Sequence, residues 1–328
     1  MSRSATQALG AVAAAENEVS LVSRRRPRWS RRRVSGLTAP YALLAPAAIV
    51  IGTVLGYPLY LLVKLSFERY GLFELIRHHG VWIGDANYSR ILHDSQFWHV
   101  VLRTIAFTAV NVSLTMVIGT AIALLLTRVD RWLRTLLTAT LVFVWATPVV
   151  VAVDTWRWMV DSQFGVVNWT LTKLHFGNYF HHDWFVNPWS GFGVITGLVV
   201  WGAIPFVTIT VYAGLSQVPE ELLEAARIDG ARSFAVFREV TLPLLKPIFV
   251  ILTSLSIIWD FQVFNQVWLM RGTQPEQDYY VMSIYSFAES FRVREFGLGA
   301  AIALVMVVTM FLVAFVYIRQ MVRMREVE

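Results

Sequence analysis

The sequence predicts an all-α polytopic membrane protein, on the basis of its composition and of six long apolar segments. Of the 328 residues, 56% are hydrophobic and 15% are charged, whereas a soluble globular protein carries about 25% charged residues. A membrane-spanning helix needs roughly 20 mostly apolar residues. None of the segments alternates with the period of two that a membrane β-strand requires, so helices are predicted throughout. The predicted spans are 41–63, 104–127, 135–160, 192–215, 247–269 and 297–318.

Several classes of chemistry are not expected of this chain. It contains no cysteine, which excludes disulfides, thiolate metal sites and cysteine nucleophiles. No G-x4-G-K-[ST] pattern for phosphate binding occurs, and no nucleophile–base arrangement stands out. His181-His182-Asp183 is interpreted as solvated loop residues rather than a metal site, because adjacent ring side chains seldom converge on one ion. We therefore expect a transport subunit rather than an enzyme, with no cofactor or metal of its own.

The distribution of basic residues predicts that both termini are cytoplasmic. With the N-terminus inside, the cytoplasmic segments hold 18 arginines and lysines and the outer loops hold seven. The basic run 24–33 is interpreted as the anchor of the first span, rather than as a nucleic-acid arm or a twin-arginine export signal. We expect a disordered basic N-terminus at 1–36, a six-helix transmembrane domain at 37–320 and a cytoplasmic tail at 321–328.

The loop between the fourth and fifth spans, residues 216–246, has internal order. Pro219 suits the first turn of a helix, and the acidic residues that follow it favour the positive helix end. Asp229-Gly230 should end this helix at 219–229, because glycine adopts the left-handed conformation cheaply. A second short helix, with apolar residues three apart, should end at Pro243. These features fit either a docking element for a cytoplasmic partner or a hairpin lying in the lipid headgroups.

The spacing of residues in this loop resembles a family signature. Glu224-Ala225-Ala226 is followed by three residues, Gly230, nine residues and then Val240-Thr241-Leu242-Pro243. This pattern resembles the EAA motif of binding-protein-dependent ABC importer permeases, with Val240 standing where that motif has isoleucine. The resemblance covers about residues 40–320, and it is strongest to the first permease of the carbohydrate importers.

The resemblance implies partners as well as residue roles. In that family the first loop helix is the coupling helix, which sits in a cleft on a separate ATPase. It implies a second permease subunit, an ATPase dimer that binds ATP and Mg²⁺, and an extracytoplasmic solute-binding protein received by the outer loops. Membrane lipid and a sugar substrate are also expected, nucleic acid is not, and the location is a bacterial inner membrane. The residues expected to couple to the ATPase are Glu224, Ala225, Ala226, Arg227, Asp229, Gly230, Leu242 and Pro243.

Polar residues in the fifth span suggest a substrate site, because polar groups inside a span are costly. On a continuous helix Ser256, Trp259 and Asp260 share one face. A Trp ring can pack on the apolar face of a sugar while polar groups bind its hydroxyls; hydrogen bonds between helices are the alternative explanation. Resemblance to the maltose importer's permease adds positions in the preceding span, and Asp260 stands where that protein has asparagine. The added positions are Gly202, Ala203 and Phe206.

A second interpretation is a proton-coupled secondary carrier that uses Asp154 and Asp260. Asp154 and Arg157 stand three apart in the third span, so they are expected to pair on one helical face. We interpret this pair as structural, near the outer end of the span.

Overall fold

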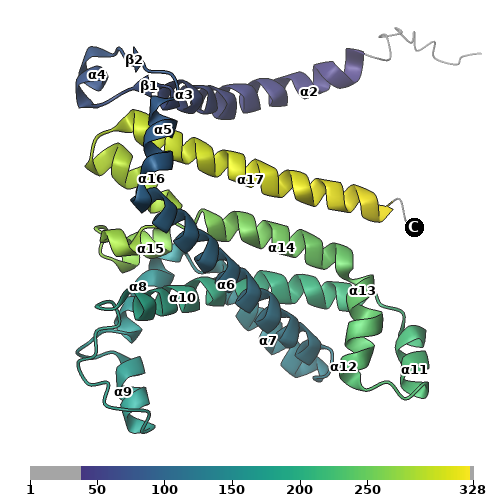
Figure 1. Cartoon of the computed structure of the whole chain (residues 1–328). Helices are drawn as coiled ribbons and strands as arrows, with labels where there is room; N and C mark the ends of the chain where they lie inside the picture. Colours follow the sequence, from purple (N-terminus) through teal and green to yellow (C-terminus); the bar gives the residue numbers. More distant parts are fainter. Residues whose placement is uncertain (1–37, 326–328) are drawn as a thin grey trace, which may run out of the picture. The chain divides into compact units, whose positions relative to one another are not determined.

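The structure is a computed structural model that describes residues 38–325, most of which are helical (Figure 1). The predicted disordered N-terminus, residues 1–36, lies outside the described residues. The chain divides into two units, one ending at Pro58 and the other beginning at Leu59, and each is described by itself.

In the first unit, the described residues form α2 (Thr38–Ile51) and one π-helical turn, η1 (Gly52–Gly56). Helix α3 (Tyr57–Ser66) carries the chain on into the second unit, so that Leu43–Ser66 is 24 residues long and apolar enough to cross a membrane. This agrees with the predicted first span at 41–63.

The second unit contains three further continuous helices of membrane-spanning length and composition. These are α6 (Ser95–Leu126), α10 (Pro188–Leu215) and α17 (Phe296–Arg325). They match the second, fourth and sixth predicted spans. Helix α17 continues beyond residue 320, where the tail was predicted to begin.

The other two predicted spans are broken. In the third, helices α7 (Arg131–Ala146) and α8 (Val149–Met159) meet at 101°. In the fifth, α14 (Lys246–Phe261) is long enough to cross a membrane only together with the loop segment before it, Ser233–Leu244, which it meets at 78°. The described chain therefore has four continuous candidate spans, or up to six if each bent pair counts as one.

The break in the third span has a local cause. Pro148 has no backbone N–H, and its ring pushes the preceding residue out of the helical region. Thr147 accordingly has extended backbone angles, φ −69° and ψ 123°. The prediction of one continuous helix at 135–160 was wrong at this point.

The fifth span is also shorter than the predicted 247–269. Helix α14 ends at Phe261, and a separate helix, α15 (Asn265–Met270), follows a short non-helical turn. A residue distant in sequence stabilises this turn: the Ser283 hydroxyl donates a hydrogen bond of 2.5 Å to the Val263 carbonyl.

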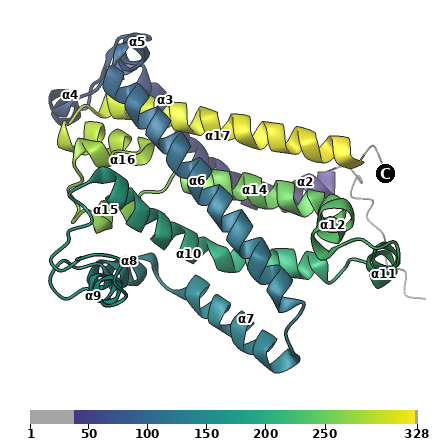
Figure 2. The same cartoon turned by 60° about the horizontal axis from the view of Figure 1, so that its bottom comes forward.

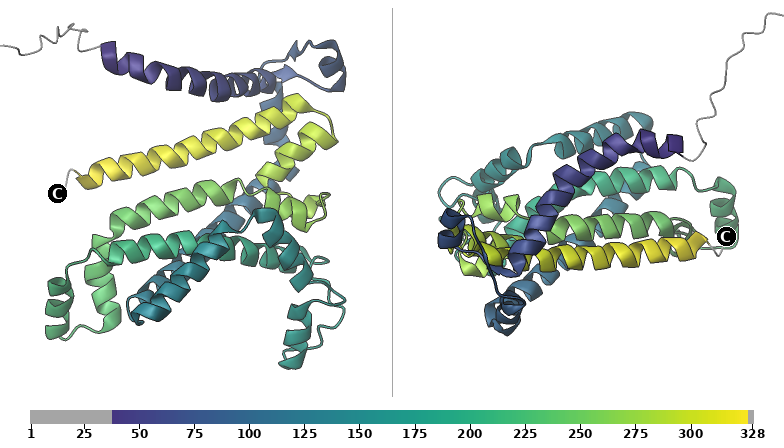
Figure 3. Two further views of the ribbon diagram at one scale, coloured as in Figure 1. Left: turned by 180° about the vertical axis from the view of Figure 1, so that it is seen from behind. Right: turned by 90° about the horizontal axis from the view of Figure 1, so that it is seen from above.

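Helices α6, α10 and α14 pack together, and Figure 2 shows α6 running obliquely across the other two. Gly119 allows the close approach of α6 to α10, because a Cβ there would lie 2.7 Å from Val207 Cγ1. The Thr208 hydroxyl also donates a hydrogen bond of 3.2 Å to the Gly119 carbonyl. Helix α14 lies beside α17 on another side, as Figure 3 shows.

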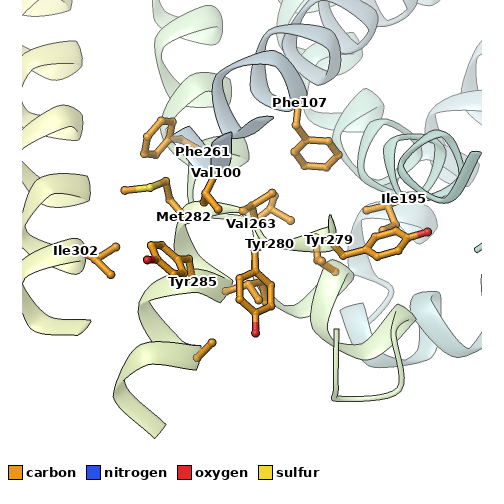
Figure 4. Close-up of a cluster of buried hydrophobic side chains, with 14 of the residues drawn as sticks. Val100, Phe107, Ile195, Phe261, Val263, Tyr279, Tyr280, Met282, Tyr285 and Ile302 are labelled. Carbon is orange, nitrogen blue, oxygen red and sulfur yellow. The ribbon is translucent and has the colours of Figure 1, made fainter. Parts of the chain in front are cut away.

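The largest buried cluster lies where α6, α10, α15, α16 (Met282–Phe287) and α17 meet. Figure 4 shows Val100 and Phe107 of α6 lying near Ile195 of α10, Tyr285 of α16 and Ile302 of α17. This cluster makes one end of the second unit a packed assembly.

Shorter elements connect these helices. An antiparallel pair of two-residue strands places Glu68 opposite Trp82 and Arg69 opposite Val81. The remaining elements are β1 (Glu68–Arg69), α4 (Leu72–Arg77), β2 (Val81–Trp82), α5 (Ala86–His93), α9 (Val166–Lys173), α11 (Glu220–Ile228), α12 (Ser233–Val236), η2 (Phe237–Thr241), α13 (Leu242–Leu244), η3 (Gln277–Tyr279) and η4 (Ala288–Arg292).

Candidate functional site

The loop between α10 and α14 forms a helical hairpin. Its first helix, α11, begins directly after Pro219 and carries Glu220 and Glu221 in its first turn, where carboxylates favour the positive helix end. Its second helix is continuous from Ser233 to Leu244. The two-helix expectation for this loop is confirmed.

The turn between the two helices depends on Gly230. Its φ of +82° lies in the left-handed region that side-chain-bearing residues avoid. The Gly230 N–H donates to the Arg227 carbonyl and the Ala231 N–H to the Ala226 carbonyl, each at 3.0 Å. These two bonds are the Schellman arrangement that ends a helix. A Cβ at residue 230 would meet nothing within 4 Å, so backbone conformation alone favours glycine in this chain.

The prediction that the second helix of the hairpin ends at Pro243 was wrong. The helix continues to Leu244, and Phe237–Thr241 widens into a π-helical turn in which the Leu242 N–H donates to the Phe237 carbonyl. A proline ring clashes with the carbonyl four residues earlier in a regular α-helix. The wider turn before Pro243 accommodates that clash, and the chain bends only at Leu245.

The hairpin exposes apolar side chains. Ile228 is 85% exposed and Phe234 is 73% exposed, although both are large and apolar. Glu224 and Ala225 are also exposed, while Ala226 is half-buried. Exposed apolar groups on a structured element mark an interaction surface, in keeping with a docking element.

A cavity of about 280 Å³ lies between α10, α14, α15 and the break between α7 and α8. Five of the six predicted substrate residues line it. The sixth, Ser256, is buried but does not line the cavity. The five that line it are Gly202, Ala203, Phe206, Trp259 and Asp260.

The cavity wall combines an aromatic pair with a buried acid. The rings of Phe206 and Trp259 meet edge to face, with centroids 5.2 Å apart. Asp260 follows directly in sequence and is only 6% exposed. No group in residues 38–325 donates a hydrogen bond to its Oδ2. An unpaired buried carboxylate is costly, so the site offers an acceptor to a ligand that carries hydrogen-bond donors.

Small residues keep part of the wall open. A Cβ on Gly202 would meet no atom within 4 Å, and Ala203 beside it has only a methyl group. The aromatic and polar side chains therefore face unfilled space rather than a packed helix.

Ten other residues line the cavity and were not predicted to contact substrate, among them Thr147, Trp201 and Gln266. Thr147 reaches the cavity because the third span breaks there, and Trp201 lies one residue before the predicted set. Gln266 lies six residues after Asp260, which on a continuous helix is a different face. The turn between α14 and α15 changes the direction of the chain, and both residues line the same cavity.

The segment after α15 is held by arginines. The Arg271 guanidinium makes two hydrogen bonds to the Glu276 carboxylate, of 3.0 and 2.6 Å, and lies 4.5 Å from the centroid of the Tyr279 ring. These hydrogen bonds hold the pKa of Glu276 below its usual range. Arg103 of α6 donates to the carbonyls of Gln277 and Tyr280. Contacts from Arg103 and Arg271 thereby fix the segment 276–280 to the rest of the second unit.

Two other predictions concern ionisable groups. Asp154 and Arg157 are both exposed on α8, and no ion pair joins them in the described structure, so the predicted pairing was wrong. Among residues 38–325, no three His, Asp or Glu side chains converge closely enough to hold a metal ion.

The sequence profile of the binding-protein-dependent transport system inner membrane components matches residues 115–325. The chain belongs to this family. It is therefore a transport permease, and membership favours the importer over the proton-coupled carrier. Members of the family are non-enzymatic transport components, and ATP hydrolysis lies on a separate chain.

Curated relatives agree with this assignment. The permease is 40% identical to the diacetylchitobiose uptake system permease protein DasB of Streptomyces coelicolor, over 90% of each chain. It is 31% identical to the inner membrane ABC transporter permease protein YcjO of Escherichia coli, covering 84% of this chain and 92% of that one. It is 32% identical to the trehalose/maltose transport system permease protein MalF of Thermococcus litoralis, covering 73% and 79%.

A solved structure shares the fold. A chain of a bacterial alginate ABC transporter, crystallised with an alginate pentasaccharide-bound periplasmic protein, superposes with a TM-score of 0.71. It is 18% identical and covers 85% of this permease and 92% of its own chain.

Proposed function

We propose that this permease subunit imports an oligosaccharide or a related glycoside, which an extracytoplasmic binding protein delivers. The observation that carries the proposal is the juxtaposition of Phe206 and Trp259 with Asp260 in one cavity. An aromatic face packs on the C–H face of a sugar ring, and a carboxylate accepts hydrogen bonds from hydroxyl or amide donors.

The relatives support a carbohydrate substrate. One is named for diacetylchitobiose uptake and another for trehalose/maltose transport. Both ligands are disaccharides rich in hydrogen-bond donors, which is what an unpaired buried acid requires. Asp260 suits an acetamido N–H or a pair of hydroxyls equally.

Coupling to ATP hydrolysis is assigned to the hairpin. In the proposed complex α11 sits in a cleft of an ATPase dimer, which binds ATP and Mg²⁺. Ala225 and Ala226 allow close approach, Glu224 orients the loop, and Gly230 makes the turn. The other residues assigned to this contact are Arg227, Asp229, Leu242 and Pro243.

Helices α10 and α14 link the two sites. Helix α10 ends at Leu215, just before the hairpin, and α14 begins at Lys246, just after it. Both helices also line the cavity. A movement of the hairpin would therefore shift both walls, which is a free-energy link between two distant sites.

The complete importer would contain a second permease subunit, with both termini of this chain cytoplasmic. Its outer segments 64–103, 161–191 and 270–296 would receive the binding protein. These assignments follow from the excess of basic residues on the proposed inner side and from membership of the family.

The test is ATP-dependent uptake in vesicles that contain this chain, its second permease and its ATPase. The binding protein is added together with either a labelled disaccharide or a labelled amino acid, and uptake of the label is measured. We expect uptake of a disaccharide that requires internal ATP and persists when the proton gradient is collapsed. Uptake of an amino acid alone, or loss of uptake with the proton gradient while ATP remains, would overturn the proposal.

A further inference from the structure

A second cavity, of about 370 Å³, lies within the second unit at the outer end of the first span. Its walls come from the end of α3, from β1, from the turn between α4 and β2, and from the start of α17. The residues that matter below are Lys64, Glu68, Tyr70, His79, Gly80 and Phe296. It shares no lining residue with the cavity at Asp260.

Glu68 is the unusual group in this cavity. It is only 6% exposed, and nothing within the described chain donates a hydrogen bond to its Oε2. Its Oε1 lies 3.7 Å from Lys64 Nζ, which is longer than a hydrogen bond, and the Lys64 side chain remains 49% exposed. A carboxylate that is buried this far normally has hydrogen-bonded partners, so the fold leaves an acceptor unsatisfied.

The backbone around Glu68 is rigid. The Asn87 side-chain amide donates to the carbonyls of Ser66 and Glu68, at 2.9 and 3.0 Å. On the other side the Gly297 N–H donates to the Tyr70 carbonyl, at 3.0 Å. The backbone that carries the carboxylate is thus held on both sides.

The rest of the wall suits a flat cation. Tyr70 and Phe296 meet edge to face with centroids 6.4 Å apart, and the exposed His79 stands at the rim. Gly80 leaves room beside the acid, because a Cβ there would collide with Glu68 Oε2. A carboxylate beside aromatic rings is the combination that binds guanidinium and ammonium groups.

We propose that this cavity receives a basic side chain, arginine or lysine, of the extracytoplasmic protein that docks on the permease. The cavity lies just beyond the Leu43–Ser66 helix and beside the first residues of α17, within an outer segment assigned to docking. Glu68 pairs with the incoming cation, and Lys64 competes with it for the same carboxylate. The identity of the partner rests on the proposed function; the class of ligand does not.

The ligand class is tested with the purified full chain in phosphatidylcholine nanodiscs. The probe is Nα-acetyl-arginine methyl ester, and its neutral analogue of the same shape is Nα-acetyl-citrulline methyl ester. Binding is followed by saturation-transfer NMR. We expect the arginine ester to bind about tenfold or more tightly than the citrulline ester, since loss of a charge-assisted pair is worth at least one decade.

Three variants make this test specific. Glu68→Gln should weaken arginine-ester binding about tenfold, while leaving folding intact because Oε2 has no partner to lose. Lys64→Gln should strengthen binding, because it removes the competing cation. Asp85→Asn, at a helix start where the side chain makes no capping bond, should change nothing. Equal affinity for the two esters, no effect of Glu68→Gln, or loss of binding in Lys64→Gln would overturn the site.

The partner is tested in the assembled importer by titrating the binding protein and measuring ATP hydrolysis. Glu68→Gln should raise the half-saturating concentration of binding protein about tenfold and leave the maximal rate unchanged. An unchanged half-saturating concentration would contradict the proposal that the occupant belongs to the binding protein. Weaker binding of the arginine ester in phosphatidylethanolamine nanodiscs would contradict it too, because a lipid amine would then occupy the cavity. The ester titration needs neither sugar nor ATP, so its failure is distinguishable from failure of the proposed function.

Discussion

Phe206 and Trp259 meet edge to face across the wall of the cavity, with ring centroids 5.2 Å apart and planes inclined at 62°. Phe206 belongs to α10 and Trp259 to α14, the two helices that flank the hairpin. The contact therefore reports on the spacing of the same two helices that a docked ATPase would move. The cavity and the hairpin are therefore connected through the same two helices, α10 and α14.

Replacement of Trp259 should weaken substrate binding in a graded way. Trp259→Ala removes the ring that is proposed to pack on the sugar and loses its contact with Phe206, whereas Trp259→Phe keeps an aromatic face. Since aromatic contacts contribute about 0.5–1.5 kcal/mol beyond the area they bury, we expect Trp259→Ala to raise the half-saturating sugar concentration about tenfold. Trp259→Phe should raise it less. Equal effects of the two variants in an uptake assay would argue against stacking.

Replacement of Asp260 separates a binding role from a structural one. The carboxylate Oδ2 has no hydrogen-bond donor within the described residues, so Asp260→Asn should not lower the thermal stability of the permease. It should weaken sugar uptake about tenfold or more, because a charge-assisted hydrogen bond is lost.

The matched control for this variant is Asp154→Asn, an exposed acid on α8 with no ion pair in the described structure. Uptake should be unchanged. Loss of uptake in Asp154→Asn together with a changed dependence on the proton gradient would instead favour the carrier mechanism.

The substrate site could be predicted only as far as the helix was regular. Trp259 and Asp260 were expected on one helical face, and both line the cavity; their contact with substrate stays a prediction. Gln266 could not be assigned, because its direction depends on the turn at 262–264, which contains no proline or glycine to signal it. The turn is stabilised by the Ser283 hydroxyl, 20 residues later in the chain, and sequence periodicity carries no information on such a contact.

Replacement of Gly230 tests the hairpin turn. Gly230→Val places a β-branched residue at φ +82°, which costs roughly 1–2 kcal/mol in the left-handed region. We expect this variant to insert into the membrane normally but to lose ATPase association and uptake.

Gly272 offers a close control, because its φ is +62° and a Cβ there also meets nothing within 4 Å. Gly272→Val introduces similar local strain in a different loop. If both variants lost ATPase association equally, the effect would be general destabilisation rather than damage to a docking element.

Replacement of Gly119 tests the packing of α6 on α10. A Cβ at this position would lie 2.7 Å from Val207 Cγ1 and 3.4 Å from the Thr208 backbone nitrogen. Gly119→Ala should lower the free energy of unfolding by about 1–3 kcal/mol through overpacking, measured as a lower Tm in detergent. Gly193→Ala, in the partner helix α10 with open space around the new Cβ, should not lower it. A Tm for Gly119→Ala equal to that of Gly193→Ala would contradict the close approach.

The helical hairpin was more predictable than the spans beside it. Pro219 and Gly230 act through their own backbone restrictions, so their effects are local and appear in the sequence. The break at Thr147 is also local, since Pro148 determines it. It was missed because the span 135–160 was predicted only from the length of its apolar run. The backbone from Glu68 to Tyr70 is held by Asn87 and Gly297, which are distant in sequence.

The central claim is that α11 docks on a separate ATPase. Its most direct test is co-purification of the tagged chain from its host in mild detergent, comparing the wild type with Ala226→Trp. The account predicts that the wild type brings down a second permease and an ATPase. The variant should keep the second permease and lose the ATPase, because the larger side chain holds the partner surface away. Recovery of no ATPase with the wild type even after crosslinking, or equal recovery with both chains, would contradict it.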